Sequence, residues 1–188
     1  SLVGMNKEAT VSLDFKAIHP AILLTWKGYS MREHDPYPDI QEIIIDSKLI
    51  ARFKKYYSID KYNPVRNIVK KLVLCLINAD SVQCAVGSCY EDLKNDNLKK
   101  GTHQEHTMRY VGLPKIDLHE IATKLEVHNH MIKEYFGIGV GNKLQWYDSE
   151  IIMHCLDVLT VNKIPCIPIH DAVICKVSDK VFVEKVMT

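Results

Sequence analysis

Residues 164–177 read IPCIPIHDAVICKV, and this stretch decides the fold that the sequence predicts. Two apolar, β-branched runs, Ile164–Ile169 and Ala172–Val177, are separated only by His170 and Asp171. That is the pattern of a β-hairpin with a two-residue turn. An aspartate at a hairpin tip is usually a turn former, so it gains chemical meaning only if a second carboxylate lies beside it.

A second carboxylate ends the first strand-like segment of the chain. Ala9–Leu13 alternates small or β-branched residues with polar ones and leads into Asp14 and Phe15, which predicts a strand that ends at an acidic side chain. The apolar run Ile18–Trp26 follows, and Pro20 suits the first turn of a helix. A carboxylate at the end of a strand is well placed to face a cleft.

The middle of the chain is predicted to be helical. Asn63 is a good N-cap, Pro64 suits the first helical position, and apolar residues recur at helical spacing as far as Ile77. Two further segments show helical spacing: Ile116–Leu125, and a longer one that Asp148 or Ser149 would cap and that ends near Asn162.

The segments between these helices are predicted to be loops. Met31–Asp39 contains two prolines, and Asp92–His106 is polar and is expected to be mobile. Gly137, Gly139 and Gly141 form a GxGxG string, but it is not the strand-to-helix turn that a dinucleotide site needs. We interpret this string as a flexible connection.

The composition is that of an ordinary folded domain. The 188 residues are 47% hydrophobic and 25% charged, which is enough to bury a core, and the net charge of +1 does not by itself indicate a nucleic-acid binder. The six cysteines include no CxxC pair, and no apolar run approaches the roughly 20 residues that span a bilayer. We therefore expect a reduced cytoplasmic setting and no membrane. One strand, several helices and a late hairpin predict an α+β fold.

Asp14 and Asp171 together have the chemistry of a two-metal phosphoryl-transfer site. Mg²⁺ prefers oxygen ligands and is commonly held by one or two carboxylates together with substrate phosphates. Two such ions activate the attacking oxygen and stabilise the leaving one. Arg66 and Lys70, four residues apart on one helix face, supply cations that would neutralise a triphosphate. The expected cofactor is Mg²⁺ or Mn²⁺.

Three motifs resemble those of family A nucleic-acid polymerases. SLDFKAIHPAIL (residues 12–23) is similar to motif A, RNIVKKLVLCLINA (66–79) to the motif B pattern RxxxKxxxFGxxYG, and PIHDAVI (168–174) to the hydrophobic-HD-hydrophobic motif C. They occur in the family's order and at similar separations. The resemblance implies one palm-and-fingers domain over residues 1–188, with an antiparallel palm sheet, a motif C hairpin and a helical fingers-like insertion over roughly 40–135.

The resemblance also implies roles for residues around the two carboxylates. Asp14 and Asp171 would bind the metal ions of a DNA polymerase-like nucleotidyltransferase, and the carbonyl of Phe15 would add a ligand. His170 would lie near the primer terminus, and Gln145 would contact template or primer. The implied partners are a primed template, nucleoside triphosphates and the remaining domains of a longer parent chain, similar to a phage or mobile-element replication protein.

Motif B and the segment after Asp14 would form the nucleotide site. Arg66 and Lys70 would contact the triphosphate, with Lys70 also acting in catalysis. His19, Leu74 and Asn78 would line the site. Leu74 and Asn78 stand where the family has Phe and Tyr, and His19 stands where its DNA polymerases have a Glu that excludes ribose. These departures leave the selectivity for the sugar open.

Two alternatives stand beside the polymerase interpretation. The first is a catalytically degenerate palm that binds nucleic acid or a partner protein in replication, which the departures at Leu74 and Asn78 favour. The second is a metal-dependent nuclease that uses the same two aspartates. A nuclease usually needs a further acidic ligand, for which Asp148 and Glu150 are the nearest candidates.

Overall fold

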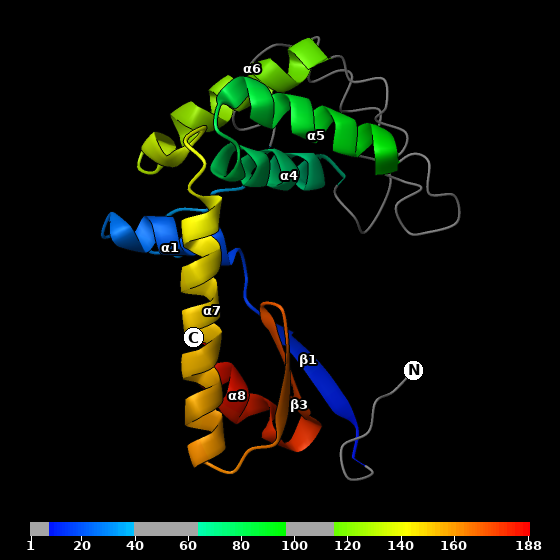
Figure 1. Cartoon of the computed structure of the whole chain (residues 1–188), viewed down its shortest axis with the longest axis vertical. Coiled ribbons are helices and arrows are strands. Elements are labelled where there is room, and N and C mark those ends of the chain that lie inside the picture. Colours follow the sequence, from blue (N-terminus) through cyan, green and yellow to red (C-terminus); the bar gives the residue numbers. More distant parts are fainter. Residues whose placement is uncertain (1–7, 40–63, 97–114) are drawn as a thin grey trace. The chain divides into compact units, whose positions relative to one another are not determined.

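The computed structural model describes residues 8–39, 64–96 and 115–188, and these ranges have an α+β fold (Figure 1). They contain six α-helices and a three-stranded antiparallel sheet. The chain forms two compact units: residues 1–22 with 143–188, here called the sheet unit, and residues 23–142, here called the helical unit. The predicted fingers-like insertion over roughly 40–135 falls within the helical unit.

The sheet consists of β1 (Thr10–Asp14), β2 (Cys166–Ile169) and β3 (Ala172–Lys176), in the order β1-β3-β2. The predicted first strand and late hairpin are both present, with ends within two residues of those expected. β3 is central and pairs with β1 from the other end of the sequence, with Leu13 opposite Val173 and Asp14 opposite Ala172. The alternation of side chains along a strand then decides what each sheet face carries.

One face of the sheet packs on helices and the other is open. Val173 and Cys175 are fully buried, and Val11, Leu13 and Phe15 of the first strand and its end pack into the same core. The helices that complete this core are α7 (Gly141–Val161) and α8 (Lys180–Val186), through Ile152, Leu159 and Val183. Ser12 and Asp14 alternate with the buried residues and are exposed, so the pleat directs Asp14 to the open face.

Helix α7 begins earlier than predicted. The expected start at Asp148 or Ser149 is wrong, because α7 begins at Gly141 and the Ser149 hydroxyl donates to the carbonyl of Trp146 within the helix, 2.7 Å away. Its end at Val161 agrees with the prediction. There the N–H of Ile164 donates to the carbonyl of Leu159, and Lys163 takes a positive φ of 57°. This left-handed cap stops the helix and turns the chain towards β2.

The helical unit is built on α4 (Pro64–Asn78), α5 (Val82–Asp96) and α6 (Lys115–His128). The predicted helices in α4 and α6 are present, and Pro64 takes the first position as expected, whereas Asn63 lies outside the described residues. The prediction of a loop from Asp92 is wrong as far as Asp96, because α5 continues there and buries Leu93; residues 97–106 lie outside the described ranges. α1 (Ile18–Trp26) has the predicted bounds.

The GxGxG string is fastened to the end of α4, which corrects its interpretation as a flexible connection. The N–H of Gly137 donates to the carbonyl of Leu76 at 2.7 Å, and that of Gly139 donates to Ala79 at 2.9 Å. The last carbonyls of a helix lack partners within the helix. The two glycine amides donate hydrogen bonds to one such carbonyl, that of Leu76, and to the carbonyl of Ala79 directly after the helix. Both glycines have a φ of +68°, which explains the residue type.

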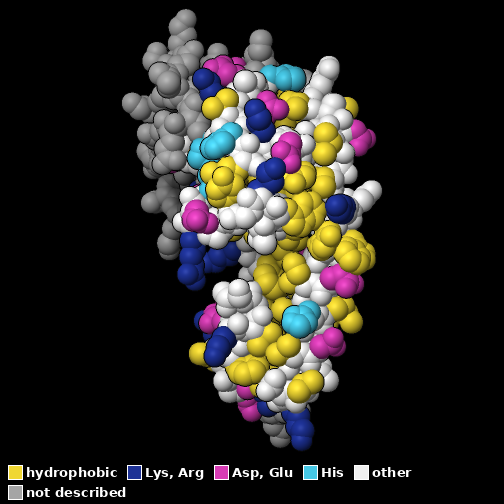
Figure 2. All heavy atoms as spheres, turned by 90° about the vertical axis from the view of Figure 1, so that its left-hand side faces the viewer, with side chains coloured by type: hydrophobic (Ala, Val, Ile, Leu, Met, Phe, Trp, Pro, Cys, Tyr) yellow, Lys and Arg dark blue, Asp and Glu magenta, His cyan; other side chains and the backbone are white. Residues whose placement is uncertain are grey.

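No helix within the described ranges is long and apolar enough to cross a membrane. Large hydrophobic side chains do reach the surface in places, among charged ones (Figure 2). In the sheet unit the most exposed are Val161, Val181, Trp146 and Met153.

Candidate functional site

The sheet brings Asp14 beside Asp171. Asp14 is paired with Ala172, the residue after Asp171, and the N–H of Phe15 donates to the Asp171 carbonyl at 3.2 Å. Because paired residues of antiparallel strands have Cα atoms about 4.5–5.5 Å apart, the backbones at Asp14 and Asp171 lie close together. Asp14 is exposed and Asp171 is half-buried. The pair therefore combines access to solvent with a fixed backbone.

The backbone is strained directly before Asp171 and three residues after Asp14. Among the described residues, three that are not glycine have a positive φ: Ala17 at 53°, Lys163 at 57° and His170 at 54°. Lys163 is the helix cap described above. Ala17 lies between β1 and α1, and His170 directly precedes Asp171 in the hairpin turn. Strain of this kind costs about 1–3 kcal/mol for each residue and collects at functional sites, which makes the end of the sheet that carries Asp14 and Asp171 a candidate site.

Replacing His170 with glycine should separate strain from chemistry. Glycine adopts a positive φ without steric cost, so His170→Gly should leave the free energy of unfolding unchanged or raise it by up to about 1 kcal/mol. If the imidazole contacts a primer terminus, the same change lowers nucleotide addition. His170→Ala is the matched control, since it removes the imidazole but keeps the strain. If urea unfolding shows a higher free energy of unfolding for His170→Ala than for His170→Gly, this account of the turn is contradicted.

Asp148 on α7 is an electrostatic neighbour of this site. Burial raises the pKa of Asp148, the nearby His19 imidazole lowers it, and the Asp171 carboxylate raises it again. Its Oδ1 atom is buried and has no hydrogen-bond partner. Across residues 8–39, 64–96 and 115–188, however, no three His, Cys, Asp or Glu side chains are grouped so as to hold a metal ion. Asp148 is thus an electrostatic neighbour of Asp171, and Glu150 is exposed on the same helix.

The raised pKa of Asp148 has a consequence for stability. A carboxyl whose folded pKa lies above its unfolded value contributes most when protonated, and this contribution is lost as pH rises through the folded pKa. Asp148→Asn should thus raise the melting temperature at about pH 7 but not at about pH 3. The gain should stay below about 2 °C, less than ~1 kcal/mol at this size, because solvent screens a partly exposed group. Equal shifts at both pH values in thermal scans would contradict this assignment.

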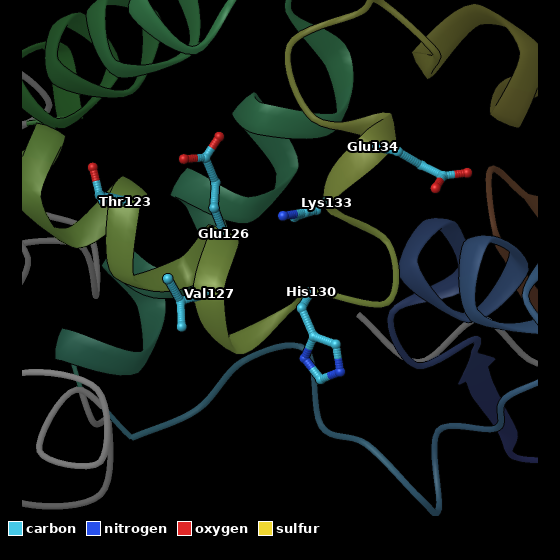
Figure 3. Close-up of a pocket in the computed structure, with 6 residues that line it drawn as sticks. All are labelled: Thr123, Glu126, Val127, His130, Lys133 and Glu134. Carbon is cyan, nitrogen blue, oxygen red and sulfur yellow. The ribbon is translucent and has the colours of Figure 1, made fainter.

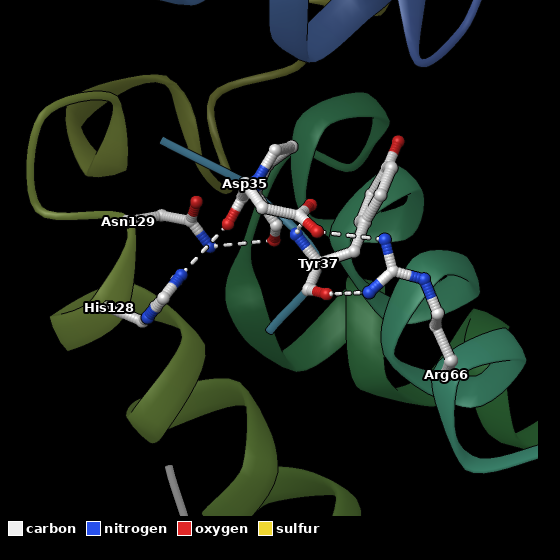
Figure 4. A network of polar contacts seen from close by, with 6 residues as sticks. Asp35, Tyr37, Arg66, His128 and Asn129 are labelled. Carbon is white, nitrogen blue, oxygen red and sulfur yellow. Dashed lines mark hydrogen bonds and ion pairs between the residues drawn. The ribbon is translucent and has the colours of Figure 1, made fainter. Parts of the chain in front are cut away.

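Arg66 of motif B holds a loop of the helical unit (Figure 4). Its guanidinium contacts the Asp35 carboxylate at 2.8 Å and donates to the carbonyl of Tyr37. The N–H of Tyr37 in turn donates to Asp35 at 2.9 Å. Burial, together with the Asp35 charge, raises the pKa of Tyr37 to about 12. The predicted loop over Met31–Asp39 is present, but its ties to Arg66 had no signal in the sequence.

Asn129 completes this network from the end of α6. It is fully buried, donates to the Pro36 carbonyl at 3.2 Å and accepts from His34 at 2.9 Å. The His34 and His128 rings lie 4.7 Å apart between centroids, and His128 bonds the Asp35 carbonyl. The loop from 34 to 37 is thus held by both α4 and α6.

Loss of the Asn129 amide should destabilise the helical unit. Asn129→Ala leaves the buried Pro36 carbonyl without a partner, which costs about 1–3 kcal/mol of unfolding free energy. Asn162→Ala is a suitable control, because Asn162 is exposed and bonds only the nearby Val158 carbonyl, so a change within about 0.5 kcal/mol is expected. Denaturant titrations of both variants measure the difference. Equal midpoints would show that the Pro36 contact contributes nothing.

The other motif B residues lie along α4 in the helical unit. Lys70 is exposed and forms no ion pair within the described part of the chain, and Leu74 is half-buried. Asn78 is exposed, but its side chain folds onto its own helix, where Nδ2 donates to the Leu74 carbonyl at 2.7 Å. Of the remaining predicted site residues, Gln145 is exposed on α7 and His19 is half-buried in the first turn of α1.

A hollow of about 520 Å³ lies elsewhere, on the helical unit (Figure 3). Its walls come from the last turns of α6 and the segment after it, and carry both signs of charge. The lining residues are Thr123, Glu126, Val127, His130, Lys133 and Glu134. None of the predicted site residues lines it, and Glu134 is already paired with Lys27 at 3.0 Å. The hollow adds nothing to the candidate site.

Comparison with known proteins does not assign a family. No protein-family model matches the chain, and no curated protein and no solved structure matches it. What supports a function is therefore the geometry around Asp14 and Asp171 and the three motifs.

Proposed function

We propose that this chain carries out template-directed nucleotidyl transfer, as a DNA polymerase-like enzyme with a palm of the family A type. The observation that carries the proposal is the pairing of β1 with β3, which sets Asp14 opposite Ala172 and bonds Phe15 to Asp171. Asp14 of motif A and Asp171 of motif C are 157 positions apart in the sequence (171 − 14), and the pairing brings their backbones together at one end of the sheet. Such convergence is what a two-carboxylate metal site requires.

Asp14 and Asp171 are the residues that would hold the ions, with the Phe15 carbonyl as a further oxygen ligand. Mg²⁺ or Mn²⁺ bound there would activate the attacking hydroxyl and stabilise the leaving pyrophosphate. His170 and Gln145 are exposed in the same unit as the two aspartates, where they can meet primer or template. His19, beside Asp148, takes the position that governs sugar choice in the family.

The triphosphate would be bound by Lys70 and, after an exchange of partners, by Arg66. Lys70 is exposed and can approach a phosphate directly. The Arg66 guanidinium is engaged by Asp35 and Tyr37, so it would have to give up at least one of these contacts to bind substrate. A charge-assisted bond to phosphate is strong enough to replace an exposed ion pair, which is worth only about 0–1 kcal/mol.

The test is extension of a labelled primer on a complementary template in Mg²⁺ or Mn²⁺, with deoxynucleotides and ribonucleotides in separate reactions. We expect addition that follows the template and stops with a metal chelator. Reactions with the primer alone control for untemplated addition. Binding of primer–template without any addition in either metal would overturn the proposal.

A degenerate palm that binds nucleic acid without catalysis is the second candidate. It is favoured by two contacts of motif B: Asn78 bonds its own helix at Leu74, and Arg66 is committed to Asp35. Both side chains are thus occupied within the protein. Fluorescence anisotropy of a labelled primer–template would detect such binding, and Asp14→Asn should not weaken it. Metal-dependent addition by the same sample would exclude this candidate.

A further inference from the structure

Helices α4 and α5 form a hairpin whose register brings two cysteines together. Only residues 79–81 separate the helices, and Lys71 of α4 pairs with Asp92 of α5 at 3.6 Å. Cys75 lies one helical turn after Lys71, and Cys89 lies one turn before Asp92. Because the two helices run in opposite directions, an ion pair at 71 and 92 places positions 75 and 89 opposite each other.

The two thiols are in contact and differ in environment. Cys89 is fully buried and Cys75 is half-buried, and the two thiols interact closely enough for each to shift the pKa of the other. This interaction lowers the pKa of Cys75 and raises that of Cys89, and burial raises the pKa of Cys89 further. The thiolate is the reactive form of cysteine, so oxidation should begin at Cys75.

We propose that Cys75 and Cys89 form a reversible disulfide that links α4 to α5 when the protein meets a peroxide. In the first step the Cys75 thiolate attacks hydrogen peroxide; the sulfur gains one oxygen as sulfenic acid, and the other oxygen leaves as hydroxide, which takes up a proton to become water. In the second, Cys89 sulfur attacks Cys75 sulfur, the S–S bond forms, and the hydroxyl leaves with the Cys89 proton as water. A dithiol reductant returns both thiols.

The other cysteines provide an internal comparison. Cys166 and Cys175 face each other on β2 and β3, but burial raises the pKa of both, so neither is activated as Cys75 is. Cys84 is exposed on α5, five residues from Cys89 and hence on a different side of the helix. A selective bond between Cys75 and Cys89 would therefore reflect the contact and not mere exposure. It requires only α4, α5 and a peroxide, and so does not depend on nucleotide addition.

The experiment is peptide mapping of the wild-type protein after graded hydrogen peroxide, digested without reductant. We expect a peptide pair joined through Cys75 and Cys89, two hydrogens lighter than its parts, that disappears with dithiothreitol. In Cys89→Ser the sulfenic acid has no partner, so dimedone should label Cys75. Cys84→Ser should behave as wild type. A bond between Cys166 and Cys175 in place of this one, linkage through Cys84, or over-oxidation of Cys75 without any linkage in wild type would overturn the proposal, whether or not the variants fold.

Discussion

Asp171→Asn is expected to abolish templated nucleotide addition while the protein stays folded. The amide keeps the size of the carboxylate but removes the charge that would hold a metal ion at the hairpin tip. Bound metal ions contribute several kcal/mol of transition-state stabilisation, and each 1.36 kcal/mol is a factor of ten in rate, so the loss should be about 10³-fold or more. Single-turnover primer extension at saturating nucleotide measures it.

Asp14→Asn should have the same effect, because Asp14 and Asp171 would share the ions. Asp157→Asn is the matched control: Asp157 belongs to the same unit, is exposed on α7, and undergoes the same change of charge. Its rate should stay within about twofold of wild type, and all three variants should unfold within about 0.5 kcal/mol of it. Nucleotide addition at the wild-type rate by both site variants would end the metal-site proposal for the polymerase and the nuclease alike.

The parts of the fold that follow from local pattern were predictable from the sequence. The two runs around His170 and Asp171 leave room only for a tight turn, so the hairpin and its position could be specified. The alternation before Asp14 predicted the first strand, and Pro64 predicted the start of α4. The pairing of β1 with β3 is not local, and its expectation rested on the resemblance of the motifs. The sheet and its register are where the structure adds most to the candidate site.

The wrong helix start and the contacts that were not predicted depend on residues outside the local pattern. Asp148 and Ser149 have the side chains of helix caps, yet α7 continues through them, since a helix start is decided by the residues before it as well. Arg66 was expected to contact a triphosphate because of its spacing from Lys70 and the resemblance to motif B, and that role stays a prediction. Its actual partners, Asp35 and Tyr37, come from a loop about thirty positions earlier, and no periodicity encodes that contact.

Gly137→Ala is expected to destabilise the helical unit strongly. A Cβ at this position would lie 2.8 Å from the backbone nitrogen of Val82 and 3.0 Å from the carbonyl carbon of Ser81, and neither backbone atom can give way cheaply. The φ of +68° adds a left-handed penalty of about 1–2 kcal/mol, and overpacking typically adds about 1–3 kcal/mol. The free energy of unfolding should fall by roughly 2–5 kcal/mol, measured by denaturant titration.

Gly28→Ala isolates the backbone part of that cost. Gly28 also has a positive φ, +80°, but a Cβ there would meet nothing within 4 Å, so only the left-handed penalty of about 1–2 kcal/mol applies. The difference between the two variants then measures the contact between the GxGxG string and the start of α5. If the GxGxG string were a flexible connection, Gly137→Ala and Gly28→Ala would lower the free energy of unfolding by the same small amount. A larger loss at Gly137 means that glycine serves there to let two backbones approach.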